Sequence, residues 1–254
     1  MKQVPNIFTL LNLIFGCLAI VFTLQNGIVL ANTGEGEQMM SMPEQIFLAS
    51  LFIGLAAVVD FFDGFLARLL KANSAMGKEL DSLADIVSFG VAPGMIIYQF
   101  LRLSIARQEN GLDASILWLL PAFILPCASA WRLAKFNLDS EQTHGFKGVP
   151  TPAVGLLVAS LPIIFWTSSQ EWVLGTLLNK WFWYGLVAIL CYLMTSNLPM
   201  MSLKVSNFAL RNNVSKIILG VVAIICAILL KWAAVPVVFL AYIVLSLTLK
   251  NKSA

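Results

Sequence analysis

Four aspartates stand close together in an otherwise apolar part of the chain, and their spacing suggests chemistry. Asp60 and Asp63 are three residues apart, and Asp81 and Asp85 are four apart. In helices, these spacings place both members of each pair on one face, and the short basic segment 71–78 would let the two faces meet. Four carboxylates facing one another in a low dielectric repel strongly unless they are protonated, hydrated or neutralised by cations. We therefore expect a cation site here.

The ligand types favour hard divalent cations. Two carboxylates from each of two facing helices suit one or two such ions, because these ions prefer oxygen ligands. A soft-metal site lacks ligands, since His144 is the only histidine and the cysteines lie apart in apolar runs, where we expect them to be packing residues. The cysteines are Cys17, Cys127, Cys191 and Cys226.

Small residues accompany the aspartates. Gly64 and Ala67 follow the first pair, and Gly77 opens the helix that carries the second pair. Small side chains allow either tight helix packing or the close approach of a bulky ligand, and beside carboxylates the ligand pocket is favoured. Because paired divalent ions bridge phosphate oxygens, the residues alone predict a two-metal phosphotransfer site. An ion or proton pathway is the alternative, since carboxylates also line transporters.

The composition predicts what holds this site. The 254 residues are 59% hydrophobic and 11% charged, and the mean hydropathy is +0.86. These values indicate an all-α, polytopic integral membrane bundle. The net charge of +3 comes without a long basic run, so the sequence predicts no nucleic acid partner.

About eight transmembrane helices are expected within a single membrane domain, 1–254. A six-helix catalytic core would cover about 1–197, and two additional helices would follow in about 198–254. Residues 27–44 are expected to form an exposed loop. The first span is expected within residues 1–25, and the others at about 46–70, 79–101, 116–137, 153–167, 181–196, 214–230 and 233–249.

The basic residues predict the orientation. Of the 16 lysines and arginines, all but four fall on the side that carries the aspartates, which by the positive-inside rule is cytosolic. An even number of spans then puts both termini in the cytosol. The four exceptions are Arg102, Arg107, Lys180 and Lys231.

The spacing around the aspartates resembles the signature of the CDP-alcohol phosphotransferases. The signature has eight positions at fixed intervals, and the chain fills them with Asp60, Asp63, Gly64, Ala67, Arg68, Gly77, Asp81 and Asp85. The resemblance implies an integral membrane enzyme that displaces CMP from a CDP-linked donor with an alcohol. It also implies that the four aspartates ligate two divalent cations, Mg²⁺ or Mn²⁺, and that Asp85 serves as the base for the acceptor hydroxyl. Gly64 and Ala67 would make room for the cytidine, and Arg68 and Gly77 would complete the CDP-lipid site.

Longer matches resemble the bacterial phosphatidylserine synthases of this family. They are PNIFTLLN at 5–12, LDSLADIVSFGVAP at 80–93, RLAKFN at 132–137 and GVPTPA at 148–153. This resemblance implies CDP-diacylglycerol and L-serine as substrates, a place among the lipids of the bacterial inner membrane, and a homodimer. Lys135 departs from the usual pattern, in which a second arginine stands there. Lysine keeps the charge but loses the bidentate fork.

Two further groups of polar residues are candidates for substrate contacts. Asn6, Thr9 and Asn12 share one helical face and would contact the nucleotide or the phosphates. Arg132 and Lys135 would hold a phosphate or the serine carboxylate. Plain polarity at helix ends is the alternative for these five residues. A related synthase that uses glycerol 3-phosphate, an inositol compound or choline, and a cation transporter, are the alternative functions.

Overall fold

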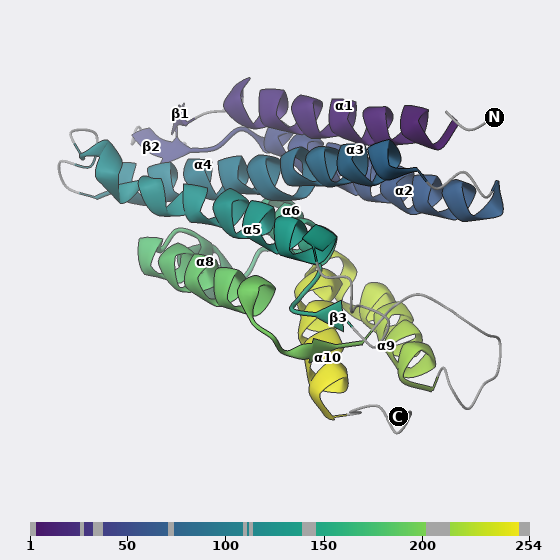
Figure 1. Cartoon of the computed structure of the whole chain (residues 1–254). Helices are drawn as coiled ribbons and strands as arrows, with labels where there is room; N and C mark the ends of the chain where they lie inside the picture. The colour runs from purple at the N-terminus through teal and green to yellow at the C-terminus, as the bar shows by residue number, and fades with distance from the viewer. Residues whose placement is uncertain are drawn as a thin grey trace.

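The computed structural model describes residues 4–25, 28–32, 38–70, 74–108, 111, 114–138, 146–201 and 214–248. Within these residues the chain is a bundle of helices with two short antiparallel strand pairs (Figure 1). The predicted all-α, polytopic membrane architecture is confirmed. The single-domain assignment stays a prediction.

The first two long helices pack side by side. They are α1 (Val4–Gln25) and α2 (Phe47–Leu69), which begins after the 3-10 turn η1 (Glu44–Ile46). The segment between them, expected to be an exposed loop, contains an antiparallel strand pair. Its strands are β1 (Val29–Asn32) and β2 (Gln38–Ser41).

The third long helix changes pitch partway along its length. It consists of α3 (Ala75–Asp85), the π-helical turn η2 (Ile86–Val91) and α4 (Ala92–Ala106), which together run on as one 32-residue stretch. Pro93 at the start of α4 lacks the N–H that a regular α-helix would use there, so the α-helical hydrogen-bond pattern is interrupted at this place. The wider π turn lies directly after Asp85.

The fourth helix begins later than the sequence predicts. Residues 116–123 form the 3-10 turns η4 (Ile116–Trp118) and η5 (Leu120–Phe123), and only then does α5 (Ile124–Leu138) begin. Pro121 and Pro126 explain the delay, because each removes a backbone donor and is tolerated only near a helix start.

The chain then crosses the bundle twice more. α6 (Thr151–Thr167) runs away from the aspartates, and the short α7 (Glu171–Leu177) turns the chain into α8 (Lys180–Thr195), which returns. The antiparallel strands β3 (Phe146–Lys147) and β4 (Pro199–Met200) join the segment before α6 to the segment after α8.

The last two helices form a hairpin at the edge of the molecule (Figure 1). α9 (Val214–Leu230) and α10 (Ala234–Thr248) pack on each other across the turn η8 (Lys231–Ala233), where Lys231 has a φ of 50°. Through α10 and η8, this hairpin also contacts α6 and β4. α9 has the predicted bounds of the seventh span.

The core lies around α4, most of which is buried. Phe100 stacks on Trp183 with ring centroids 4.8 Å apart. Gln99 donates from Nε2 to the Thr23 carbonyl oxygen at 3.0 Å, which ties α4 to the far end of α1. These contacts hold α1, α4 and α8 together at the end of the bundle away from the aspartates.

Four stretches of the described residues are long and apolar enough to cross a membrane, or five if the bent pair α7 and α8, with 69° between its members, forms one span. α6 is a shorter apolar helix. The structure thus supports several membrane-spanning helices, and the count of eight stays a prediction. The four stretches are Pro5–Gln25, Glu44–Leu69, Ala75–Ala106 and Ser215–Thr248.

Candidate active site

The predicted convergence of the aspartates occurs between α2 and α3. Asp60, Asp63 and Asp81 can each place one carboxylate oxygen within 4.8 Å of the others. Asp63 is buried, and Asp60 and Asp81 are half-buried. Asp81 Oδ1 is buried and has no hydrogen-bond partner among the described residues. Three gathered carboxylate oxygens, together with a carboxylate atom that has no partner among the described residues, fit a hard divalent cation.

Asp85 lies one helical turn beyond Asp81 and deeper in the protein, with 7% of its surface exposed. It is outside the group of three just described, although its charge interacts with those of Asp60 and Asp81. The Asn12 amide donates from Nδ2 to Asp85 Oδ1 at 3.3 Å. Asp85 is therefore a buried carboxylate beside the cation group, with one oxygen held by α1.

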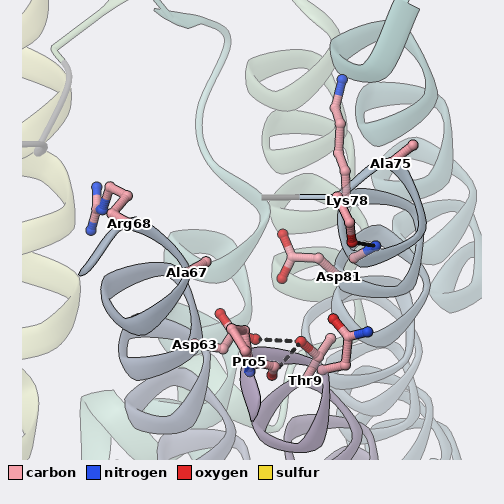
Figure 2. Close-up of a pocket in the computed structure, with 12 residues that line it drawn as sticks. Pro5, Thr9, Asp63, Ala67, Arg68, Ala75, Lys78 and Asp81 are labelled. Atoms are coloured by element: carbon pink, nitrogen blue, oxygen red, sulfur yellow. Dashed lines mark hydrogen bonds between the residues drawn. The ribbon is translucent and has the colours of Figure 1, made fainter. Parts of the chain in front are cut away.

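α1 also holds Asp63. Thr9 Oγ1 lies 2.8 Å from Asp63 Oδ2 and 3.2 Å from the Pro5 carbonyl oxygen. Its single proton can serve only one of them fully, and the nearer, charged acceptor forms the stronger bond. Figure 2 shows Thr9 turned toward Asp63. Polar atoms of Thr9 and Asn12 contact two of the aspartates, and the expected contacts of these residues with the nucleotide or the phosphates stay a prediction.

The π turn fixes how α1 crosses the third helix. Ser88 in η2 donates from Oγ to the Asn12 carbonyl oxygen at 3.0 Å. Gly16, one turn further along α1, lies directly against Ser88, where a Cβ atom would collide with the Ser88 side chain and backbone. This close crossing sets the position of Asn12, and through it the position of the Asp85 carboxylate.

A pocket of about 660 Å³ opens beside the cation group, between α1, α2 and the start of α3 (Figure 2). Asp63 and Asp81 face each other across it. A Cβ atom added at Gly64 would meet nothing within 4 Å, so this side of α2 leaves open space. At Gly77 a Cβ atom would lie 3.0 Å from Ser74 Oγ and 3.1 Å from Asn6 Oδ1, so α3 packs closely against these two side chains. The pocket is lined by Pro5, Asn6, Thr9, Asp63, Gly64, Ala67, Arg68, Ser74, Ala75, Gly77, Lys78 and Asp81.

The predicted CDP-lipid residues therefore mostly share this pocket. Asn6, Thr9, Gly64, Ala67, Arg68 and Gly77 line it, whereas Asn12 does not. Figure 2 shows the Arg68 guanidinium directed away from Asp63 and Asp81. Lys78, which the sequence reading did not select, also lines the pocket and donates from Nζ to the Asn137 carbonyl oxygen at 3.2 Å.

The two basic residues of α5 that were predicted to bind substrate lie apart from this pocket. Arg132 is buried and donates from Nη1 to Thr151 Oγ1 at 3.2 Å, while its buried Nε has no partner among the described residues. Its charge interacts with that of Asp85. Lys135 is exposed and donates from Nζ to Asn197 Oδ1 at 2.8 Å. Asp85 thus has the cation group and pocket near it and a buried guanidinium within electrostatic range.

Sequence reasoning missed several of these partners. Thr151 lies within the GVPTPA segment, which is one of the matches to the phosphatidylserine synthases, so the sequence does point to this segment. Ser88 and Asn137 also lie within matched segments, LDSLADIVSFGVAP and RLAKFN, but no local pattern indicates their contacts, because the partners lie at least 55 residues away in the chain. Asn197 lies outside every matched segment.

Comparison with known proteins bears on what this arrangement does. Residues 2–192 match the family model described as CDP-alcohol phosphatidyltransferase. The chain is similar to the CDP-diacylglycerol–serine O-phosphatidyltransferase of Bacillus subtilis, with 34% identity over 65% of this chain and 78% of the relative. It is 29% identical to the enzyme of that name from Mycobacterium tuberculosis, over 95% of this chain and 76% of the relative. The yeast Saccharomyces cerevisiae enzyme of that name is 40% identical over 47% of this chain and 42% of the relative.

Proposed function

Because the chain belongs to the CDP-alcohol phosphatidyltransferase family, we propose that it transfers the phosphatidyl group of CDP-diacylglycerol to the hydroxyl of L-serine, giving phosphatidylserine and CMP. The observation that carries this proposal is the group formed by Asp60, Asp63 and Asp81, of which Asp63 and Asp81 line a pocket large enough for a nucleotide. The relatives named for serine transfer support the choice of acceptor.

The pocket suits the CDP part of the donor. Its size falls within the usual range for small-molecule sites, and the open space beside Gly64 leaves room for the cytidine. α2 and α3, which both contribute residues to the pocket, also carry exposed apolar side chains, among them Phe61, Leu69 and Met76. They would contact the acyl chains of the donor in the bilayer, so that the lipid part stays in the membrane while the diphosphate reaches the aspartates.

We propose Mg²⁺ or Mn²⁺ as cofactor, two ions in each site. Asp60, Asp63 and Asp81 would hold the first ion, and Asp85 would complete the set for the second. When bound, such ions offset the charge of the diphosphate and the charge that develops on its oxygens during transfer. Thr9 keeps the Asp63 carboxylate in place through its 2.8 Å hydrogen bond.

Asp85 would act as the base. The Asn12 amide holds Asp85 Oδ1, which leaves Oδ2 to accept the proton of the serine hydroxyl. The serine oxygen then forms a bond to the phosphorus that carries diacylglycerol. The bond between that phosphorus and the bridging oxygen breaks, and CMP leaves with the electron pair.

The two basic side chains of α5 would bind the acceptor, L-serine. Arg132 lies within electrostatic range of Asp85, and its buried Nε has no partner among the described residues, so the guanidinium has a donor left for a carboxylate. Lys135 is exposed and adds a second positive charge three residues along α5. We propose that they hold the serine carboxylate while its hydroxyl faces Asp85.

Gly64→Leu tests the donor pocket. Leucine is a better helix former than glycine, and its Cβ atom would meet nothing within 4 Å, so we expect the protein to fold normally. The longer side chain would fill the space meant for the cytidine and raise the KM for CDP-diacylglycerol about tenfold or more, because each 1.4 kcal/mol of lost binding is tenfold. Initial rates of CMP release at varied donor concentration would measure it.

Gly54→Leu is the matched control for this variant. Gly54 lies on the same helix, a Cβ atom there also meets nothing within 4 Å, and it does not line the pocket. Its donor KM should equal that of the wild type. Equal donor KM values for both variants would show that the nucleotide does not bind in this pocket.

The acceptor is tested by incubating purified protein in CDP-diacylglycerol vesicles with Mn²⁺ and one acceptor at a time. We expect CMP release with L-serine to exceed release with glycerol 3-phosphate, inositol or choline at least a hundredfold, because sites that pair with a substrate's polar groups reject analogues lacking them. Release with another acceptor alone would assign a sister activity of the family. Cation flux into sealed vesicles without CMP release would instead support a transporter.

We also propose that the protein is a multi-pass protein of the bacterial cell membrane, with the active site and both termini in the cytosol. The excess of lysine and arginine on the side of the aspartates supports this orientation. A homodimer among membrane lipids stays a prediction, which light scattering in detergent would check.

A further inference from the structure

The strand pair β3–β4 connects the hydrogen-bond partners of Arg132 and Lys135, the two residues proposed to bind serine. Thr151, which accepts the hydrogen bond from Arg132, lies four residues after β3. Asn197, which accepts the hydrogen bond from Lys135, lies two residues before β4. Any shift of this strand pair would move both partners together, so β3–β4 sets the geometry around Arg132 and Lys135.

The turn that follows β3 is closely fitted to the end of α8. Gly148 donates from its backbone N–H to the Leu198 carbonyl oxygen at 2.9 Å, and Val149 donates to the Leu193 carbonyl oxygen at 3.0 Å. Gly148 has a φ of +73°, and a Cβ atom there would lie 2.5 Å from the Met194 carbonyl oxygen. Only glycine fits this turn, and the path from β3 to Thr151 is thereby fixed.

α10 fastens the other side of the strand pair. Tyr242 donates from its hydroxyl to the Met201 carbonyl oxygen at 3.0 Å, and the Met201 backbone N–H donates to Ser246 Oγ at 3.1 Å. Both side chains are buried, with 4% and 6% of their surfaces exposed. Met201 directly follows β4, so its two backbone groups are fixed by one face of α10.

We propose that Tyr242 and Ser246 are positioning residues for the acceptor: by holding residue 201, α10 keeps β3–β4 where Thr151 and Asn197 orient Arg132 and Lys135. This inference rests on the proposed function and adds to it. α10 lies beyond residues 2–192, which match the family model. On this proposal α10 contributes to acceptor binding by positioning residues of the catalytic core.

Tyr242→Phe is the first test, because it removes only the hydroxyl. We expect the KM for L-serine to rise about three- to tenfold, which corresponds to one lost hydrogen bond. Both kcat and the KM for CDP-diacylglycerol should stay within about twofold of the wild type, because no donor contact changes. Ser246→Ala, which removes the hydrogen-bond acceptor for Met201 N–H, should also raise the KM for L-serine. Tyr192→Phe is the control, since Tyr192 is 67% exposed on α8.

An acceptor without the carboxylate makes the test specific. Serinol keeps the amine and hydroxyl of serine but has no carboxylate, so it gains nothing from Arg132 and Lys135. Tyr242→Phe should therefore lower the preference for L-serine over serinol by the same factor as it raises the serine KM. Equal losses with both acceptors, together with a lower melting temperature, would show a merely structural role and overturn the inference.

The acceptor with which the wild type releases CMP shows whether this inference or the proposed function has failed. If the wild type releases CMP with L-serine but neither variant changes the serine KM, the inference fails alone. If it uses glycerol 3-phosphate instead, the serine assignment fails, and the same variants are then compared with glycerol 3-phosphate and glycerol. If it uses only uncharged acceptors, both fail.

Discussion

Asp85→Asn should lower the rate of CMP release by two to four powers of ten, the usual contribution of a general base. The amide has nearly the same shape as the carboxylate but cannot accept the proton of the acceptor hydroxyl. The variant should remain folded, because it removes a buried charge that interacts unfavourably with Asp60 and Asp81. Its circular dichroism spectrum and gel-filtration profile should match those of the wild type, while CMP release with saturating L-serine is lost.

Glu79→Gln is the matched control, since Glu79 is an exposed carboxylate on the same helix α3. It should release CMP at the wild-type rate. A folded Asp85→Asn protein that keeps a tenth or more of the wild-type kcat would refute the assignment of Asp85 as the base.

Removal of divalent cations by EDTA should stop turnover, with at least a hundredfold loss, and addition of Mn²⁺ should restore it. Chelation should also lower the melting temperature, because an ion that binds only the folded protein stabilises it. Asp60, Asp63 and Asp81 then face one another without a counter-ion. Full activity in EDTA would contradict the metal-dependent mechanism.

Asp81→Asn should change the melting temperature in opposite directions in EDTA and in Mn²⁺. In EDTA the variant should melt above the wild type, because one of the repelling charges is gone. In Mn²⁺ it should melt below the wild type, because the ion has lost a ligand. Thermal unfolding of both proteins in each condition would measure this crossover, and Glu79→Gln should show none. A variant that is less stable in both conditions would mean that Asp81 does not serve mainly as a cation ligand.

Much of the fold could be predicted from apolar runs. The bounds of α9 match the expected span, and α6, α8 and α10 begin and end within about two residues of expectation. The meeting of Asp60, Asp63 and Asp81 also followed from spacing, because i and i+3 or i+4 positions share a helical face. These features depend on residues close together in the chain, which local patterns describe well.

The remaining features depend on contacts between distant parts of the chain. Asn12 and Asp85 are 73 residues apart, and no local pattern shows that the amide would be used by a carboxylate instead of a ligand. The strands β3 and β4 have two residues each, which is too short for an alternating pattern. The late start of α5 was predictable from Pro121 and Pro126, and the apolar run concealed it.

The π turn after Asp85 has a consequence for alignment and redesign. A helical wheel drawn over Ala75–Ala106 with 100° per residue would assign wrong faces to everything beyond Val91, because η2 contains a wider turn than an α-helix. Removing a single residue from this turn would let it become a regular α-helical turn, and the two aspartates would keep about the same orientation relative to the buried face of α4. An alignment of this segment should therefore allow a one-residue difference in length between Asp85 and Pro93.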